Sequence, residues 1–185
     1  MELMRYIAFL RAINVGGHIV RMDRLRGLFE TLKFRNVETF IASGNVIFET
    51  SSSDEAKLTA RIEQHLEKTL GYEVRTFLRT DEELQAMATY QPFGRHLLEG
   101  PRHGLYVGML HAPPERGAER KLAALGTKAD HFHIAGRELY WLVTTLLSES
   151  KISGATLERA IGMPATLRNV NTIDRLARRL AKRDA

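Results

Sequence analysis

The stretch Tyr6–Glu49, YIAFLRAINVGGHIVRMDRLRGLFETLKFRNVETFIASGNVIFE, decides the fold, because its apolar runs end in two polar tips that carry glycine. The first tip is Arg11–Gly17 and the second is Ser43–Asn45. Tyr6–Leu10 is a short, partly aromatic apolar run followed by a polar loop, which predicts a buried strand rather than a helix. The stretch therefore opens with a strand whose end leads into a glycine-bearing loop.

An amphipathic helix and a hairpin follow the first tip. From Met22 to Leu32 the apolar residues recur at three- and four-residue steps between charged ones, which predicts a helix with one buried face. Val37–Ile41 and Val46–Phe48 each place alternate side chains on one face, as strands do. Ser43–Asn45 is the predicted turn between them. The order so far is strand, helix, strand, strand.

A second helix and a fourth strand complete this part of the chain. Ser51–Asp54 is a polar linker that ends in an N-cap residue, and leucines and isoleucine then recur every four residues until Gly71. Tyr72–Arg79 alternates as a strand with one covered face does. Residues 5–79 therefore predict a βαββαβ unit, which is the ferredoxin-like order.

The remaining residues predict the same order again, without a visible sequence repeat. Asp81 is expected to cap a brief helix, and the proline- and glycine-bearing residues 91–103 form the expected linker. The elements expected after it are a strand at Leu105–Leu110, a helix opened by Pro113–Pro114, a hairpin of His131–Ile134 and Glu138–Val143, a helix at Gly154–Ile161, a strand at Ala165–Arg168 and a final helix from Asn171, with Asn171 and Asp174 as its capping box. We therefore predict an α+β fold of two ferredoxin-like halves, residues 1–90 and 104–185, with a C-terminal helix.

Two motifs carry a resemblance to a known family. Leu10–Gly17, LRAINVGG, and Ser43–Phe48, SGNVIF, resemble the opening signature of the bacterial family called domain of unknown function 1697. Pro164–Thr172, PATLRNVNT, resembles its closing motif, so the similarity spans nearly the whole chain. The usual form of the signature has glycine where this chain has Ala12. The resemblance implies an α+β architecture and a bacterial, intracellular setting, and it implies no chemistry.

Composition bounds the class of protein. A chain of 185 residues with 44% hydrophobic and 26% charged residues is an ordinary globular protein of one large or two small domains. It has no apolar run long enough to span a bilayer and no signal-peptide pattern, so a cytoplasmic location without membrane association is expected. Cys is absent, which excludes disulfides, thiolate nucleophiles and cysteine-ligated metals.

The net charge of +5 is concentrated at one end of the chain. Residues 151–185 hold eight Lys or Arg against three Asp or Glu, and the first 150 residues sum to zero. Such an end can attract nucleic acid, a phosphorylated metabolite or an acidic protein, or it can be the solvated face of a terminal helix. Residues 151–185 contain no aromatic residue for base stacking, and the sheet lacks the aromatic pattern of RNA-binding domains. Nucleic-acid binding therefore stays possible, but no sequence motif supports it.

Two polar groups are candidates for a ligand site. Glycines after a strand let backbone N–H groups approach an anion, and an arginine adds a forked donor. The candidate ligand-binding residues are Arg11, Asn14, Gly16, Gly17, Ser43, Asn45, Arg168 and Asn169. The structural alternative is a positive-φ turn at Gly16–Gly17 and a hairpin turn at Ser43–Asn45. The first tip matches neither the dinucleotide nor the Walker fingerprint.

Arg11 and Arg168 each end a predicted strand, and an Asn follows each of them closely. We predict that the two arginines share one pocket for a small anionic, phosphorylated ligand; the alternative is two separate surfaces with unrelated ion pairs. His131 and His133 share a strand face but lack a third ligand, so neither a metal nor a cofactor is expected.

No nucleophile with an adjacent base can be recognised, and His18 is the one histidine to test as an acid or base. The sequence leaves three classes open: a binding protein or enzyme for a small anion, a nucleic-acid-binding protein that uses the basic end, and a non-catalytic interaction module. Whether the chain is an enzyme and whether it forms oligomers stay open.

Overall fold

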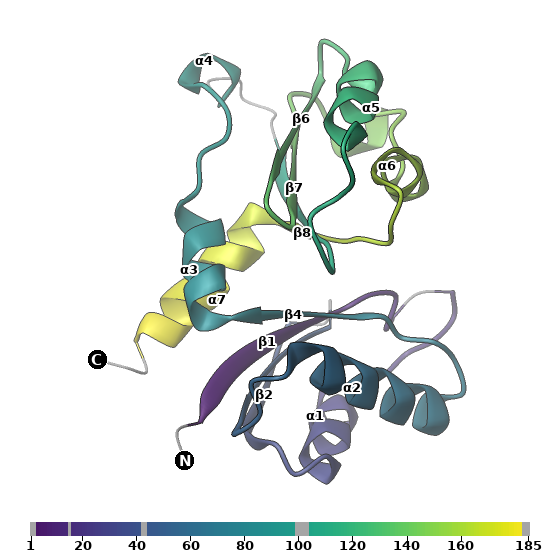
Figure 1. The fold of residues 1–185 in the computed structure, drawn as a ribbon, viewed down its shortest axis with the longest axis vertical. Helices are drawn as coiled ribbons and strands as arrows, with labels where there is room; N and C mark the ends of the chain where they lie inside the picture. The colour runs from purple at the N-terminus through teal and green to yellow at the C-terminus, as the bar shows by residue number, and fades with distance from the viewer. Residues whose placement is uncertain (1–2, 15, 42–43, 99–103, 183–185) are drawn as a thin grey trace. The chain divides into compact units, whose positions relative to one another are not determined.

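The computed structural model of the chain describes residues 3–14, 16–41, 44–98 and 104–182. They divide into two compact units, residues 1–84 and 85–185, each of which has its own sheet. Figure 1 draws the course of the chain through both.

The first unit is a four-stranded antiparallel sheet with two helices on one face (Figure 1). Its elements in chain order are β1 (Met4–Leu10), α1 (Met22–Thr31), β2 (Arg35–Phe40), β3 (Asn45–Thr50), α2 (Glu55–Leu70), β4 (Thr76–Thr80) and the start of α3 (Asp81–Thr89). The strands lie in the order β2-β3-β1-β4, and every neighbouring pair is antiparallel. The predicted βαββαβ order is therefore confirmed for this unit.

Alternation along the strands decides which side chains meet the helices. Tyr6, Ala8 and Leu10 of β1 pack in one cluster with Phe29 of α1 and Ile62 of α2. The residues predicted to begin and end α2 are confirmed. The Oδ1 atom of its N-cap, Asp54, accepts a hydrogen bond from the Lys57 N–H, and Gly71 ends the helix in a left-handed conformation with φ 83°.

The opposite face of the same sheet is buried as well. Ile7, Phe9, Phe77 and Arg79 are all fully buried, so the prediction that the fourth strand has one covered face is wrong. The charged residues around Phe77 suggested a solvated face. Instead, the Arg79 guanidinium is enclosed, and its Nη1 donates to the Leu78 carbonyl at 2.7 Å.

Two predicted helix starts are corrected by one or a few residues. Thr80, not Asp81, is the N-cap of α3, because the Glu83 N–H donates to Thr80 Oγ1 at 3.3 Å and Glu83 Oε2 accepts from the Thr80 N–H at 2.9 Å. In the second unit, Pro113–Pro114 lies in a loop, and the helix begins only after Gly117, whose φ is 97°.

The second unit repeats the layout. Its elements are the rest of α3, α4 (Arg95–Leu98), β5 (Gly104–Met109), α5 (Ala118–Leu125), β6 (Asp130–Ala135), β7 (Glu138–Val143), the 3-10 turn η1 (Leu147–Glu149), α6 (Gly154–Ile161), β8 (Thr166–Asn169) and α7 (Val170–Ala181). The strand order is β6-β7-β5-β8, again antiparallel throughout. The second half and its terminal helix are therefore as predicted. The predicted boundaries at residues 90 and 104 stay a prediction, and α4 lies inside the expected linker.

One capping prediction in this unit is wrong. Asn169, not Asn171, is the N-cap of α7, because its Oδ1 accepts the Asn171 N–H at 2.9 Å. The apolar stripe of α7 is confirmed, since Ile173, Leu176 and Leu180 are fully buried.

The three inner-to-edge strands β3-β1-β4 and β7-β5-β8 correspond residue by residue. Ile7 of β1 lies between Ile47 of β3 and Arg79 of β4, and Val107 of β5 lies between Tyr140 of β7 and Arg168 of β8. Ile7 and Val107, Ile47 and Tyr140, and Arg79 and Arg168 therefore occupy equivalent strands and positions in the two sheets. The two buried arginines therefore occupy equivalent places, which supports a structural duplication.

Candidate functional site

The two glycine-bearing tips of the first unit lie against each other at the end of β1. The Leu10 N–H donates to the Gly44 carbonyl at 2.8 Å. Gly44 has φ 78°, and a Cβ placed on it would lie 2.5 Å from Cγ2 of Ile13. Only glycine fits there, so the second tip packs directly on the β1–α1 loop, which comprises residues 11–21. Ser43 lies outside the described residues.

The β1–α1 loop is held from within the unit. The Arg11 N–H donates to the Arg75 carbonyl at 2.8 Å, and the Tyr72 hydroxyl donates to the Ile13 carbonyl at 2.9 Å. The His18 ring stacks on the Tyr72 ring with 3.9 Å between centroids. Tyr72 therefore braces the loop at two points, although it is not among the predicted site residues.

Asn14 closes the loop on itself, since its Oδ1 accepts the Val20 N–H at 2.6 Å. Gly16 and Gly17 form the exposed tip with φ 63° and 88°, and a Cβ on either would meet nothing within 4 Å. Ala12 also has a positive φ, 61°, at the position where the family signature has glycine. The loop thus combines a fixed base with an open, glycine-bearing tip.

Two arginines, Arg21 and Arg24, lie where this loop enters α1. Arg21 is the N-cap of α1, and its side chain caps no N–H group of the helix; in the first turn the Arg24 N–H donates to Asp23 Oδ1 at 2.9 Å. Burial raises the pKa of Tyr72, and the positive charge of Arg24 partly opposes that rise. Asp23 is a carboxylate at this end, 3.3 Å from Arg21, and hydrogen bonding from the Arg24 N–H is the main cause of its lowered pKa.

Asn45 stabilises the β2–β3 hairpin of the first unit. It is fully buried, and its Nδ2 donates to the Phe40 carbonyl at 2.9 Å across the β2–β3 hairpin. This bond holds the turn that presses on the β1–α1 loop.

Arg168 of the second unit is 8% exposed. Its Nη1 donates to Thr166 Oγ1 and to the Leu167 carbonyl, both at 3.0 Å. Burial lowers the pKa of Arg168 to about 10, so the guanidinium keeps its charge at neutral pH. Asn169 follows as the α7 cap and lines a hollow of about 180 Å³ beside Tyr106.

The predicted site residues fall in both units. Arg11, Asn14, Gly16, Gly17 and Asn45 belong to the first unit, and Arg168 and Asn169 belong to the second. A pocket shared by Arg11 and Arg168 stays a prediction.

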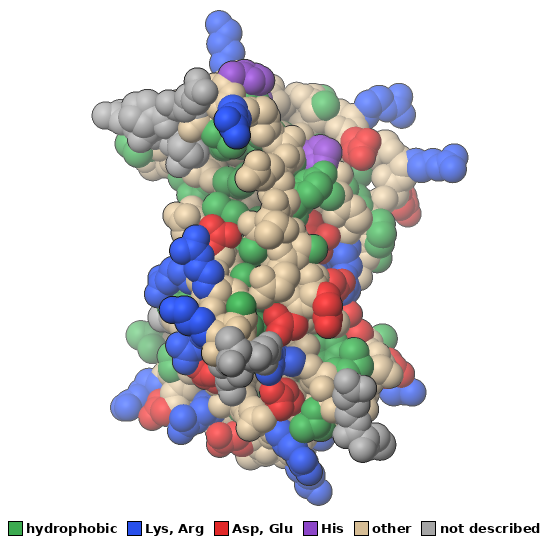
Figure 2. Space-filling view, turned by 90° about the vertical axis from the view of Figure 1, so that its left-hand side faces the viewer, with side chains coloured by type: hydrophobic (Ala, Val, Ile, Leu, Met, Phe, Trp, Pro, Cys, Tyr) green, Lys and Arg blue, Asp and Glu red, His purple; other side chains and the backbone are tan. Residues whose placement is uncertain are grey.

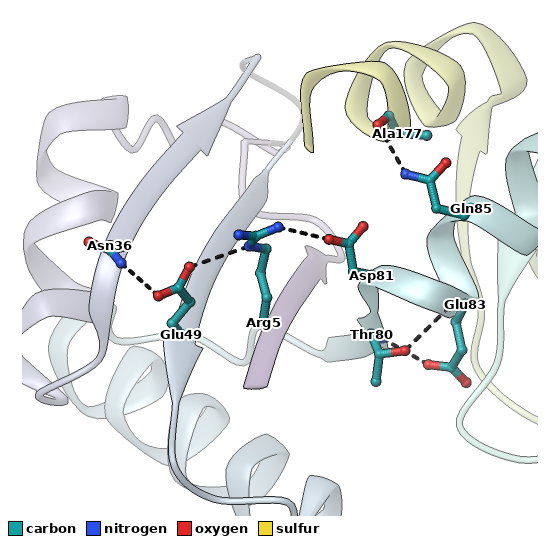
Figure 3. Close-up of polar contacts among 8 residues, drawn as sticks. All are labelled: Arg5, Asn36, Glu49, Thr80, Asp81, Glu83, Gln85 and Ala177. Carbon is teal, nitrogen blue, oxygen red and sulfur yellow. Dashed lines mark hydrogen bonds and ion pairs between the residues drawn. The ribbon is translucent and has the colours of Figure 1, made fainter. Parts of the chain in front are cut away.

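A half-buried ion-pair network in the first unit was not predicted (Figure 3). Arg5 Nε lies 3.3 Å from Glu49 Oε1, and Arg5 Nη1 lies 2.9 Å from Asp81 Oδ2. Asn36 Nδ2 donates to the other Glu49 oxygen at 2.6 Å. The signal was the β1–β3 register, which sets Arg5 directly opposite Glu49. This network joins two strands to the start of α3 and has a structural role.

Within the described ranges, no three His, Asp or Glu side chains are placed to hold a metal ion. Across the same ranges, no helix has the length and apolar character needed to cross a bilayer.

Comparisons with known proteins agree with this fold. The chain is similar to a solved structure described as the conserved bacterial protein SP0830 from Streptococcus pneumoniae, with a TM-score of 0.70 and 23% identity over 97% of this chain and 99% of that chain. At that identity the likeness concerns the fold alone. No curated protein sequence matches the chain. A family model described as "Protein of unknown function (DUF1697)" matches residues 3–140, which include both tips of the first unit and end before the PATLRNVNT motif. The chain therefore belongs to the DUF1697 family of proteins of unknown function.

Proposed function

We propose that the β1–α1 loop binds a small anionic ligand through a phosphate or similar group. The observation that carries the proposal is the braced loop whose two positive-φ glycines face open space ahead of α1. Successive N–H groups in such a loop form a concave donor surface, and a helix N-terminus adds a partial positive charge.

The side chains around the loop favour an anion. Arg11 stands half-buried at the start of the loop, His18 stacks on Tyr72, and the charge of Arg24 acts on the Tyr72 hydroxyl. A guanidinium binds phosphate or carboxylate oxygens through two parallel hydrogen bonds. Among the described residues of the loop there is no nucleophile paired with a base, so the proposal is limited to binding.

Thermal shift tests the proposal. Pyrophosphate, ribose 5-phosphate, AMP and citrate are titrated against the full chain and against Arg11→Gln, with Lys68→Gln, at an exposed position of α2, as the charge-matched control. A bound anion raises the unfolding free energy by about 2.7 kcal/mol at a concentration of 100 Kd. We expect a raised Tm for the unmodified chain and for Lys68→Gln, and a smaller rise for Arg11→Gln. A Tm unchanged by all four probes, or an equal rise in Arg11→Gln, contradicts the proposal.

Nucleic acid is the second candidate ligand, favoured by the composition of the second unit. Residues 85–185 hold fifteen Lys or Arg against nine Asp or Glu, a net charge of +6. Helix α7 buries its apolar stripe and exposes Arg175, Arg178 and Arg179. Figure 2 shows exposed Lys and Arg side chains on the side of the chain where α3 and α7 lie. A phosphate backbone would bind there without base stacking.

The cytoplasmic location stays a prediction.

A further inference from the structure

The outer edges of β2 and β6 are equivalent in the two sheets, yet only one of them is blunted. In β2 the register shifts between Arg35 and Glu38, and Asn36 has φ 48°. A bulge and charged side chains of this kind prevent another strand from pairing. The strand β6 pairs regularly with β7 along all six of its residues, Asp130–Ala135, and contains no Lys, Arg, Glu or Pro. In the described part of the chain β6 has a strand on one side only.

The direction of the hydrogen bonds shows which residues face the free side of β6. The Thr144 N–H donates to the Ala129 carbonyl at 2.8 Å, so residue 129 faces β7, and every second residue after it does the same. Phe132 and Ile134 consequently direct their N–H and C=O groups outward. The outward carbonyl of Asp130 already accepts the Thr127 N–H at 3.0 Å. Phe132 and Ile134 thus supply the groups that a further strand would use.

A second copy of this strand fits that edge in an antiparallel register centred on His133. Phe132 of one copy then pairs with Ile134 of the other through both hydrogen bonds, and the two side chains lie on the same face. An aromatic side chain beside a β-branched one is a favourable cross-strand pair. Position 133 faces itself across the two-fold axis, as a pair without hydrogen bonds.

The surroundings of β6 suit a self-contact. Phe132 and Ile134 line a hollow of about 270 Å³ against Leu122 of α5, on the side that the partner's Ile134 and Phe132 would cover. The one carboxylate of the strand, Asp130, is 4% exposed. Its oxygens accept bonds from Trp141 Nε1, Ser150 Oγ and Thr127 Oγ1, at 3.1, 2.7 and 2.8 Å. A second copy therefore brings no exposed like charge to the edge.

We infer that the chain self-associates into a two-fold dimer by antiparallel pairing of β6 with β6, which joins the two β6–β7–β5–β8 sheets into one. The contact is one strand long and smaller than a standard interface of about 1,600 Å², so the dimer is concentration-dependent. The inference is independent of the anion site, which lies in the first unit.

A single introduced cysteine tests the register, because the chain has none of its own. In the proposed pairing the two Cα atoms at position 133 lie about 4.5 Å apart, within the range of a disulfide. We expect His133→Cys to form a disulfide-linked dimer under mild oxidation. The matched control is Glu38→Cys, because Glu38 of β2 lies opposite Ile47 as His133 lies opposite Tyr140. Equal cross-linking of the two variants overturns the inference.

Sedimentation velocity over a concentration series tests the association itself. The unmodified chain is expected to show a sedimentation coefficient that rises with concentration. His133→Glu gives β6 the side chain that β2 has at this position, and two carboxylates facing each other would repel, so this variant is expected to stay monomeric.

Because His133 Nε2 lies 2.8 Å from the Tyr90 hydroxyl, His133→Gln controls for that contact and keeps the association. Gln64→Glu, at an exposed position of α2, controls for net charge. Circular dichroism confirms that each variant is folded, and a monomeric unmodified chain at every concentration overturns the inference.

Discussion

At the scale of single residues, Gly44 and Gly17 are both left-handed, but only Gly44 is enclosed. Gly44→Ala adds a methyl group 2.5 Å from Ile13 Cγ2 and forces alanine into a left-handed conformation. We expect a loss of about 2–4 kcal/mol of unfolding free energy, against about 1 kcal/mol for Gly17→Ala, which has only the backbone cost. Urea denaturation measures both. Equal losses would show that Gly44 does not pack on the loop.

Ala12 presents the reverse case. A φ of 61° costs alanine about 1–2 kcal/mol, whereas glycine adopts it without strain. Glycine also lowers the unfolding free energy by about 0.4–1 kcal/mol, because it gives the unfolded chain more conformational entropy. Ala12→Gly is therefore expected to leave the unfolding free energy unchanged or to raise it. Ala60→Gly, on an exposed position of α2, should lower it by about 1 kcal/mol. Urea denaturation of both variants decides, and a clear loss for Ala12→Gly would contradict the left-handed conformation.

Glu63 makes stability depend on pH. Burial raises its pKa above the ordinary 4.5, partly offset by the hydrogen bond that its Oε1 accepts from the Thr76 N–H. The folded state therefore binds the proton of the Glu63 carboxyl more tightly than the unfolded state does. The contribution of Glu63 to the unfolding free energy is present at low pH and is lost as pH rises through the raised pKa. Glu63→Gln keeps the acceptor without the charge. Thermal melts should show the variant gaining on the parent as pH rises above about 4.5, and a constant difference would contradict the shift.

Sequence patterns were reliable where one residue type has one use. Asp54 and Gly71 were predicted as the two ends of α2 because a short acceptor and a left-handed glycine suit those places. Arg79 was not predicted to be buried, because arginine in an alternating strand ordinarily marks a solvated face. Burial on both faces of a sheet depends on tertiary packing, which one strand's pattern does not contain.

At the scale of elements, Arg5 joins β1, β3 and α3, and its side chain is 20% exposed. Arg5→Met would leave Glu49 and Asp81 without this cation, and Asp81 Oδ1 is already buried without a hydrogen-bond partner. We expect a loss of about 1–3 kcal/mol in unfolding free energy. Hydrogen exchange should show the first turn of α3 opening more readily than in the parent. Arg26→Met, at an exposed ion pair with Glu30, is the control, with a loss of at most about 1 kcal/mol.

The elements themselves followed from periodicity, and their ends did so less well. Proline is common at the first position of a helix, yet α5 begins only after Gly117 and not at Pro113–Pro114. Asn169 and Asn171 are equally good caps by type, and only the backbone of β8 decides that Asn169 takes the role. The candidate loop was located by its glycines, whereas its brace, Tyr72, is 59 positions away from the carbonyl it binds. Contacts at such sequence distance leave no local pattern.

At the scale of the whole molecule, the uneven charge predicts the salt dependence of nucleic-acid binding. Replacing Arg175, Arg178, Arg179 and Lys182 by Gln removes four cations from α7 and its end. If α7 binds phosphates, the slope of log K against log salt should fall by up to about 3.6. The matched control replaces Arg26, Lys33, Lys57 and Lys68 of the first unit and should keep the parent slope. Fluorescence anisotropy with a labelled oligonucleotide measures both, and the absence of binding by the parent at low salt ends this candidate.

The matching registers of the two sheets also allow a comparison of residues within one chain. Where the strand registers match, a residue of the first sheet has a counterpart in the second that meets the same backbone geometry. Leucine at 10 and 110 and arginine at 79 and 168 are the same in both copies. Gly44 and Arg137, which accept equivalent hydrogen bonds, are not. Exchanging a residue for its counterpart therefore separates what the shared backbone geometry requires from what is particular to one sheet, without a second protein for reference.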